Sequence, residues 1–196
     1  LPTTPTFLNI FLLSREYKKR NLTSIKLITF GAEFMPSELL KRLKQTFKRV
    51  KFKQTYGLSE IGVMRTKSKD NDSLSIKVGG EDYKIKIINE ILYIKSKSNM
   101  VGYLNAPQPF DKDGWMNTKD RVIDKGDGYL RIIGRQSEII NVGGEKVYPQ
   151  EIENTLLKCD GIADSRVYKD RHDILGEYVV AEVVFNSSLN KKRKNK

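Results

Sequence analysis

The chain has 196 residues, of which 38% are hydrophobic, and this is enough to bury a core in one or two domains. A single cysteine and a single histidine exclude an internal disulfide and a zinc site built from those residue types. The most continuous apolar run near the end of the chain, at 179–185, is broken by Glu182 and is far shorter than the roughly 20 residues of a membrane helix, so no membrane span is expected. Residues 1–14 lack the basic start and cleavage site of a signal peptide, which predicts a cytoplasmic location.

The net charge of +12 raises the question of a nucleic-acid partner. The lysines are spread along the chain and do not alternate with stacking aromatics, so we expect no specific nucleic acid. A nucleic-acid binder remains a hypothesis that rests on charge alone, and it would bind with a steep salt dependence.

Residues 1–74 predict an αβ portion of a larger domain. A short apolar strand at 25–30 is followed by Pro36, which is well placed to open an amphipathic helix. Residues 51–54 predict a second strand, and 55–62 a loop. Strand, helix and strand in this order favour a parallel sheet with ligand groups at the strand ends. Candidate chemistry is therefore expected in the loop.

Residues 75–134 change to short β-rich runs that predict a small antiparallel, barrel-like subdomain. Residues 83–88 and 91–95 form a predicted hairpin around a turn at Asn89 and Glu90. A Gly-rich turn precedes another strand at 129–133. Helix signals are scarce in this part of the chain.

Residues 135–186 predict a second, incomplete α+β domain. A strand at 138–142 precedes a Gly-Gly turn, Pro149 opens a helix over 150–157, and strands follow at 163–168 and 178–185. The basic tail 187–196 has few apolar residues to bury, which predicts disorder.

Four motifs occur in a fixed order along the chain. They are Gly31-Ala32-Glu33, then Gln54-Thr55-Tyr56-Gly57-Leu58-Ser59-Glu60, then Gly114-Trp115-Met116-Asn117-Thr118-Lys119-Asp120 with Gly134-Arg135, and finally the run from Gly143 to Glu153. Each motif is weak alone. Together they resemble the superfamily of AMP-forming acyl-CoA synthetases, peptide-synthetase adenylation domains and luciferase, over nearly the whole chain except the basic tail.

A nucleotide needs a flat face for its base and acceptors for its ribose hydroxyls. Tyr56 can stack on adenine, and Gly31 and Gly57 permit close approach of the backbone. Asp120 can accept hydrogen bonds from both ribose hydroxyls. Gln54 can reach the adenine edge, although a strand-end glutamine that satisfies backbone groups is nearly as good an interpretation.

A nucleotide also needs donors and a cation for its phosphates. Ser59 can donate to phosphate, and Glu60 is an oxygen ligand suited to magnesium, so these two are the candidate catalytic residues. Arg135 offers a charged fork for ribose or phosphate oxygens. The resemblance implies these roles and extends the ATP and AMP site to Ala32 and Glu33. Taken singly, Tyr56 would be a core or surface aromatic, Glu60 a charge at a helix start, and Asp120 with Arg135 a surface ion pair.

The stretch 134–153 resembles the junction between the large and small domains of that superfamily. Ser137 occupies the hinge position, where relatives usually have aspartate or lysine, and Gly143 and Gly144 would approach the acceptor thiol or form a hairpin turn. Lys119 is a second departure, because glycine commonly precedes the ribose-binding aspartate. The loop geometry at Asp120 is therefore in question.

The resemblance implies an α/β fold: the C-terminal part of the large adenylating domain, with a parallel-sheet αβ portion and a small antiparallel β-barrel, followed by an incomplete small α+β domain. The implied activity uses ATP and Mg²⁺ to convert a carboxylic acid to an acyl-adenylate and passes it to coenzyme A or a phosphopantetheine carrier protein. A glycine-rich phosphate loop and a C-terminal lysine are not found in the chain. We therefore expect a fragment with little catalysis of its own. A non-catalytic nucleotide- or carrier-binding remnant and an amino-acid-activating domain are the alternatives.

Overall fold

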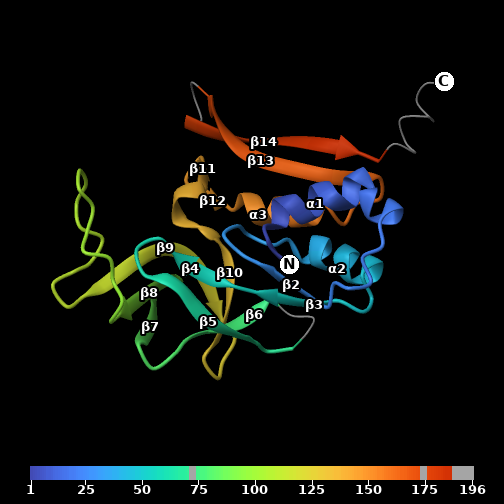
Figure 1. Cartoon of the computed structure of the whole chain (residues 1–196). Coiled ribbons are helices and arrows are strands. Elements are labelled where there is room, and N and C mark those ends of the chain that lie inside the picture. Colours follow the sequence, from blue (N-terminus) through green and yellow to red (C-terminus); the bar gives the residue numbers. More distant parts are fainter. Residues whose placement is uncertain (71–73, 173–175, 187–196) are drawn as a thin grey trace. The chain divides into compact units, whose positions relative to one another are not determined.

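The computed structural model describes residues 1–70, 74–172 and 176–186 (Figure 1). The chain divides into two compact units, the first formed by 1–35 and 43–136, and the second by 36–42 and 137–196. The basic tail predicted at 187–196 lies outside the described residues. Within the described part of the chain, no helix combines the length and the apolar composition that crossing a bilayer requires.

The first unit contains a small parallel sheet at its N-terminal end. Strands β1 (Pro2–Thr3), β2 (Leu27–Phe30) and β3 (Lys51–Gln54) lie in the order β1-β2-β3, and both pairings are parallel. This confirms the predicted parallel sheet. Residues 1–14, for which the sequence indicated no element, form β1 and helix α1 (Pro5–Ser14), and a short 3-10 turn η1 (Glu16–Lys19) follows.

A seven-stranded antiparallel sheet makes up the rest of the first unit, in the order β4-β5-β6-β10-β9-β8-β7. Its strands are β4 (Tyr56–Leu58), β5 (Gly62–Ser68), β6 (Ser75–Gly79), β7 (Tyr83–Ile88), β8 (Ile91–Ser96), β9 (Trp115–Asp124) and β10 (Tyr129–Arg135). Strands β4 and β5 precede residue 75, so the antiparallel sheet begins earlier than the sequence texture indicates. The predicted loop 55–62 is correspondingly a strand followed by a turn.

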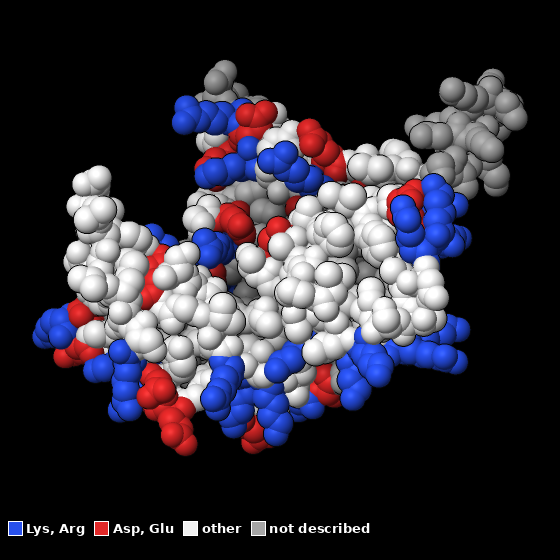
Figure 2. Space-filling model, viewed as in Figure 1, with Lys and Arg blue, Asp and Glu red and all other residues white. Residues whose placement is uncertain are grey.

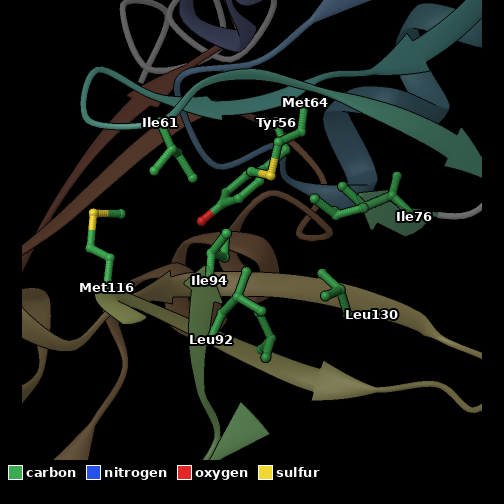
Figure 3. Close-up of a cluster of buried hydrophobic side chains, with 10 residues drawn as sticks. Tyr56, Ile61, Met64, Ile76, Leu92, Ile94, Met116 and Leu130 are labelled. Atoms are coloured by element: carbon green, nitrogen blue, oxygen red, sulfur yellow. The ribbon is translucent and has the colours of Figure 1, made fainter. Parts of the chain in front are cut away.

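The sheet encloses one hydrophobic core. Figure 3 shows side chains of β4 and β5, including Tyr56 and Met64, facing Leu92 of β8 and Leu130 of β10. Leu92 is fully buried, with 0% of its surface exposed. Successive side chains along each strand point to opposite faces of the sheet, and those on the inner face pack into this core.

The hairpin β7–β8 forms as the sequence indicates. Asn89 and Glu90 have φ values of 49° and 63°, and Ile88 pairs with Ile91 across them. A two-residue turn with two positive φ angles matches the twist of the flanking strands, and asparagine tolerates this conformation better than most residues.

The second unit contains a four-stranded sheet in the order β12-β11-β14-β13. Its elements are η2 (Gln136–Glu138), β11 (Ile140–Val142), β12 (Glu145–Val147), α3 (Pro149–Leu156), β13 (Ile162–His172) and β14 (Gly176–Phe185). The strand predicted at 138–142 is shorter, because η2 occupies its beginning. Pro149 opens α3 as predicted.

Helix α2 (Ser37–Thr46) forms where the sequence places a helix after Pro36. Its apolar residues Leu39, Leu40 and Leu43 are buried, whereas Lys41 is exposed. Residues 36–42 group with the second unit, where the Arg42 guanidinium donates to backbone carbonyls of the chain after α3.

Candidate nucleotide site

Three predicted site residues meet in the first unit. Asp120 lies in β9 and is 4% exposed. The Tyr56 hydroxyl donates to its Oδ2 at 2.5 Å, and Nε of Arg135 donates to its Oδ1 at 3.1 Å. Asp120 and Arg135 are direct partners across β9 and β10, so strand pairing brings them together. Both carboxylate oxygens of Asp120 are therefore held in a fixed direction.

The partners of Asp120 differ in exposure. Burial, followed by the charge and hydrogen bond of Asp120, raises the pKa of Tyr56, so the phenol stays neutral and acts as a donor. The Arg135 side chain is 53% exposed, compared with 6% for that of Asp120. The guanidinium thus lies where a ligand can reach it, and the pair is not an ordinary exposed ion pair because its carboxylate is buried.

The backbone around Asp120 contains a bulge. Thr118 accepts from the Asp120 amide at 3.1 Å and donates to the Leu92 carbonyl at 2.8 Å, which anchors this part of β9 to β8. Lys119 has a φ of 60°, and the β8–β9 register shifts beside it. Lys119 therefore adopts the left-handed conformation that glycine takes most easily. The backbone before Asp120 thus has the turn that a glycine would permit, although a lysine occupies the position.

Replacing Lys119 tests this conformation. Lys119→Val should lower the free energy of unfolding by about 1 kcal/mol relative to Lys119→Gly, because a β-branched residue is unfavourable at positive φ. Urea unfolding of both variants measures the difference. Lys84→Val, at an exposed lysine of β7, is the matched control and should change stability by about 0.5 kcal/mol or less. Equal stabilities of Lys119→Val and Lys119→Gly would contradict the interpretation.

Ser59 and Glu60 lie in the turn between β4 and β5. Ser59 is exposed and Glu60 is partly buried. The Tyr103 hydroxyl donates to Oε1 of Glu60, and the Met100 amide donates to the Glu60 carbonyl at 2.8 Å. The alternative that Glu60 starts a helix is wrong, since strand β5 follows the turn.

Gly31, Ala32 and Glu33 follow β2, and two of them have structural roles inside the chain. A Cβ on Gly31 would lie 2.4 Å from Oγ1 of Thr55, so glycine allows the two segments to touch. Oε2 of Glu33 accepts from the Thr6 amide at 2.9 Å and from its hydroxyl at 2.6 Å, which caps the first turn of α1. Ala32 is exposed, with a φ of 68°.

Gln54 and Gly57 flank Tyr56 in the chain. Gln54 is 8% exposed, and its Oε1 is buried without a hydrogen-bond partner in the protein. An unpaired buried acceptor is costly, which makes this oxygen a candidate for a ligand donor. A Cβ on Gly57 would lie 2.7 Å from Cα of Val63, so glycine is needed for the β4–β5 pairing itself.

The predicted junction residues lie in the second unit. That unit begins again at Ser137, which is in η2 and exposed. Gly143 and Gly144 have φ values of 56° and 94° and form the turn of the β11–β12 hairpin, so the hairpin interpretation is confirmed. Their approach to a thiol stays a prediction.

The sequence interpretation missed Thr118, Met100 and Tyr103. Thr118 lies two residues before Asp120 in the same motif, and its hydroxyl is the signal that could indicate a backbone anchor there. Met100 and Tyr103 lie outside the four sequence motifs. Nothing in local sequence predicts a contact between Tyr103 and Glu60, which are 43 residues apart.

Comparisons with known proteins identify the family of this chain. The AMP-binding enzyme family model matches residues 1–104, and the chain belongs to this family. Indoleacetate–CoA ligase of Aromatoleum aromaticum is 31% identical over 199 residues, covering 92% of this chain and 38% of the relative. 4-Coumarate–CoA ligase 1 of Arabidopsis thaliana is 29% identical over 206 residues, covering 93% of this chain and 37% of the relative. The chain thus spans less than two fifths of these relatives.

Solved structures establish the fold. An anthranilate CoA ligase in complex with anthranoyl-AMP matches with a TM-score of 0.77 and 18% identity, covering 99% of this chain and 42% of that one. An amide bond synthetase from Marinactinospora thermotolerans matches with a TM-score of 0.76 and 19% identity, covering 95% of this chain and 42% of that one. The predicted combination of a parallel sheet, an antiparallel barrel-like part and a small α+β part of an adenylating enzyme is confirmed.

Proposed function

We propose that these residues form part of the nucleotide site of an AMP-forming acid–thiol ligase. In its first step a substrate carboxylate attacks the α-phosphorus of ATP. A P–O bond breaks, pyrophosphate departs, and the product is an acyl-adenylate. In the second step a thiol sulfur attacks the acyl carbon and AMP leaves, while the thiol proton passes to solvent or a base. The observation that carries the proposal is the Asp120 carboxylate, oriented by Tyr56 and Arg135.

The nucleoside is assigned to the residues around Asp120. Its carboxylate accepts the ribose hydroxyls, and the half-exposed Arg135 supplies further donors to ribose or phosphate oxygens. Oε1 of Gln54, which has no protein partner, can accept from the exocyclic amino group of adenine. Tyr56 is 7% exposed, so it contributes mainly by orienting Asp120, with base stacking limited to the exposed part of its ring.

The phosphates are assigned to the β4–β5 turn. Ser59 donates to phosphate, and Glu60 supplies one carboxylate to magnesium. Among the described residues there is no cluster of three or more acidic, histidine or cysteine side chains for a metal. Magnesium is commonly held by one or two carboxylates together with the phosphates of the nucleotide and water, so Glu60 with the nucleotide would suffice. Bound there, the ion would screen phosphate charge during attack by the carboxylate.

The acceptor half of the reaction is assigned to the second unit. In the proposal Ser137 is the hinge, and the Gly143-Gly144 turn lies close to the thiol of coenzyme A or of a phosphopantetheine carrier. A Cβ at Gly143 or Gly144 would meet no atom within 4 Å, so the turn is open to a ligand. The same proposal includes a division of the chain into residues 1–74, 75–134, 135–186 and 187–196. It also includes a cytoplasmic location.

Nucleotide binding by the 196-residue chain tests the site directly. Calorimetry should detect AMP binding, and 2′,3′-dideoxy-AMP, which lacks both ribose hydroxyls, should bind at least roughly tenfold more weakly. Absence of binding at millimolar AMP would contradict a formed site. Equal binding of the two nucleotides would contradict the role of Asp120.

The whole reaction is tested on the full-length protein. Acid-dependent exchange of labelled pyrophosphate into ATP is the expected result for an adenylate-forming ligase. If no acid in a broad panel supports exchange while AMP still binds, a non-catalytic nucleotide-binding protein replaces the ligase proposal. An affinity for nucleic acid that falls steeply with salt would instead support the alternative based on charge. On the face shown in Figure 2, basic side chains are scattered with acidic ones among them.

A further inference from the structure

The loop between β8 and β9 is tied to the turn that carries Glu60. The Met100 amide donates to the Glu60 carbonyl at 2.8 Å, and the Tyr103 hydroxyl donates to Oε1 of the same residue. One bond fixes the backbone of Glu60 and the other fixes its side chain. Both segments belong to the first unit.

Residues 103–108 of this loop are exposed. Figure 1 shows the segment projecting from the sheet after β8. Val101 and Leu104 are 105% and 100% exposed, whereas Tyr103 between them is 41% exposed. Gly102 has a φ of 148°, a conformation that favours glycine, and it separates the outward Val101 from Tyr103. The chain thus turns the tyrosine hydroxyl toward Glu60 while its apolar neighbours face solvent.

A glutamate side chain has several rotatable bonds, and a cation that binds it must restrict them. A donor on one carboxylate oxygen restricts them in advance. Because Tyr103 donates to Oε1, the second oxygen, Oε2, keeps a defined direction in which it can face a cation. Groups that orient a metal ligand in this way typically change metal affinity by roughly 10-fold to 100-fold when they are removed.

We propose that Tyr103 is a positioning residue, which holds the Glu60 carboxylate in the orientation that binds a phosphate-bound magnesium ion. This inference rests on the proposed nucleotide site. It adds a residue outside the four sequence motifs and gives the exposed β8–β9 loop a role in that site.

The test is the magnesium dependence of ATP binding to Tyr103→Phe. For the unaltered chain, calorimetry should show tighter ATP binding with excess Mg²⁺ than with EDTA. In Tyr103→Phe the magnesium-dependent part of the affinity should fall roughly tenfold, while AMP affinity, measured without metal, stays unchanged. A purely structural loss would weaken AMP and ATP binding together.

Tyr168→Phe is the matched control, because its hydroxyl also donates to a glutamate, Glu182, at 3.1 Å, but in the second unit. Its magnesium dependence should equal that of the unaltered chain. If Tyr103→Phe keeps the full magnesium dependence and binds AMP, the positioning role is overturned and the nucleotide site stands. If the unaltered chain binds AMP but shows no magnesium dependence, the inference is overturned as well. If it binds no AMP, both proposals fail.

Discussion

Asp120→Ala should lower the AMP affinity of the chain by roughly 100-fold, since two hydrogen bonds to a charged group are lost. The change also leaves the buried Tyr56 hydroxyl without its acceptor and removes one partner of Arg135. An unpaired buried hydroxyl costs about 1–3 kcal/mol, so the free energy of unfolding should fall as well. Calorimetry with AMP and urea unfolding of the same preparations measure the two effects.

Two further variants separate binding from folding. Asp120→Asn keeps the size of the side chain and an acceptor for Tyr56, so it should restore much of the stability but not the affinity. Asp82→Ala removes an exposed carboxylate whose ion pair with Lys97 is also exposed, and it should leave both quantities nearly unchanged. If Asp120→Ala and Asp82→Ala bind AMP equally well, Asp120 does not hold the ribose.

Gly57→Ala should destabilise the chain by about 1–3 kcal/mol through overpacking. The added Cβ would lie 2.7 Å from Cα of Val63 and 2.8 Å from the Gly62 carbonyl, and both are backbone atoms that cannot swing away. The β4–β5 hairpin must open to make room. Because Tyr56 adjoins Gly57 on β4, AMP binding should weaken at the same time.

The control for this change lies in the same hairpin. Gly62 has a φ of 77°, but a Cβ there would meet no atom within 4 Å. Gly62→Ala should therefore show only the conformational cost of about 1 kcal/mol. Urea unfolding should give Gly57→Ala a lower free energy of unfolding than Gly62→Ala. The reverse order would mean that backbone conformation, and not close approach, requires glycine in this hairpin.

Local patterns predicted much of the fold. The strand at 51–54, the hairpin around Asn89 and Glu90, and the helix opened by Pro149 all form as expected. Each depends on interactions between residues close in sequence, such as turn conformations and helix starts. Boundaries moved where two elements compete, as at η2, which shortens the strand expected at 138–142.

The candidate site was less accessible to local reasoning. The sequence named Tyr56, Asp120 and Arg135 but did not predict that the tyrosine is buried and donates to the aspartate. Glu33 was expected at the nucleotide, which stays a prediction, and the sequence did not indicate that its carboxylate caps α1. The glycines at 31 and 57 were expected to admit a ligand, and the close atoms at both positions belong to the chain itself.

The sequence by itself determined the family and the parallel and antiparallel parts, because motif order and turn residues are written locally. It also named the candidate residues for nucleotide chemistry, and their roles stay a prediction. Only the tertiary structure decided the partners of those residues. Strand pairing placed Arg135 beside Asp120, and the β8–β9 loop brought Tyr103 to Glu60. It also showed that Lys119 takes a glycine conformation. These outcomes depend on contacts between segments far apart in the chain, and their geometry is fixed only when the strands have paired and packed on their core.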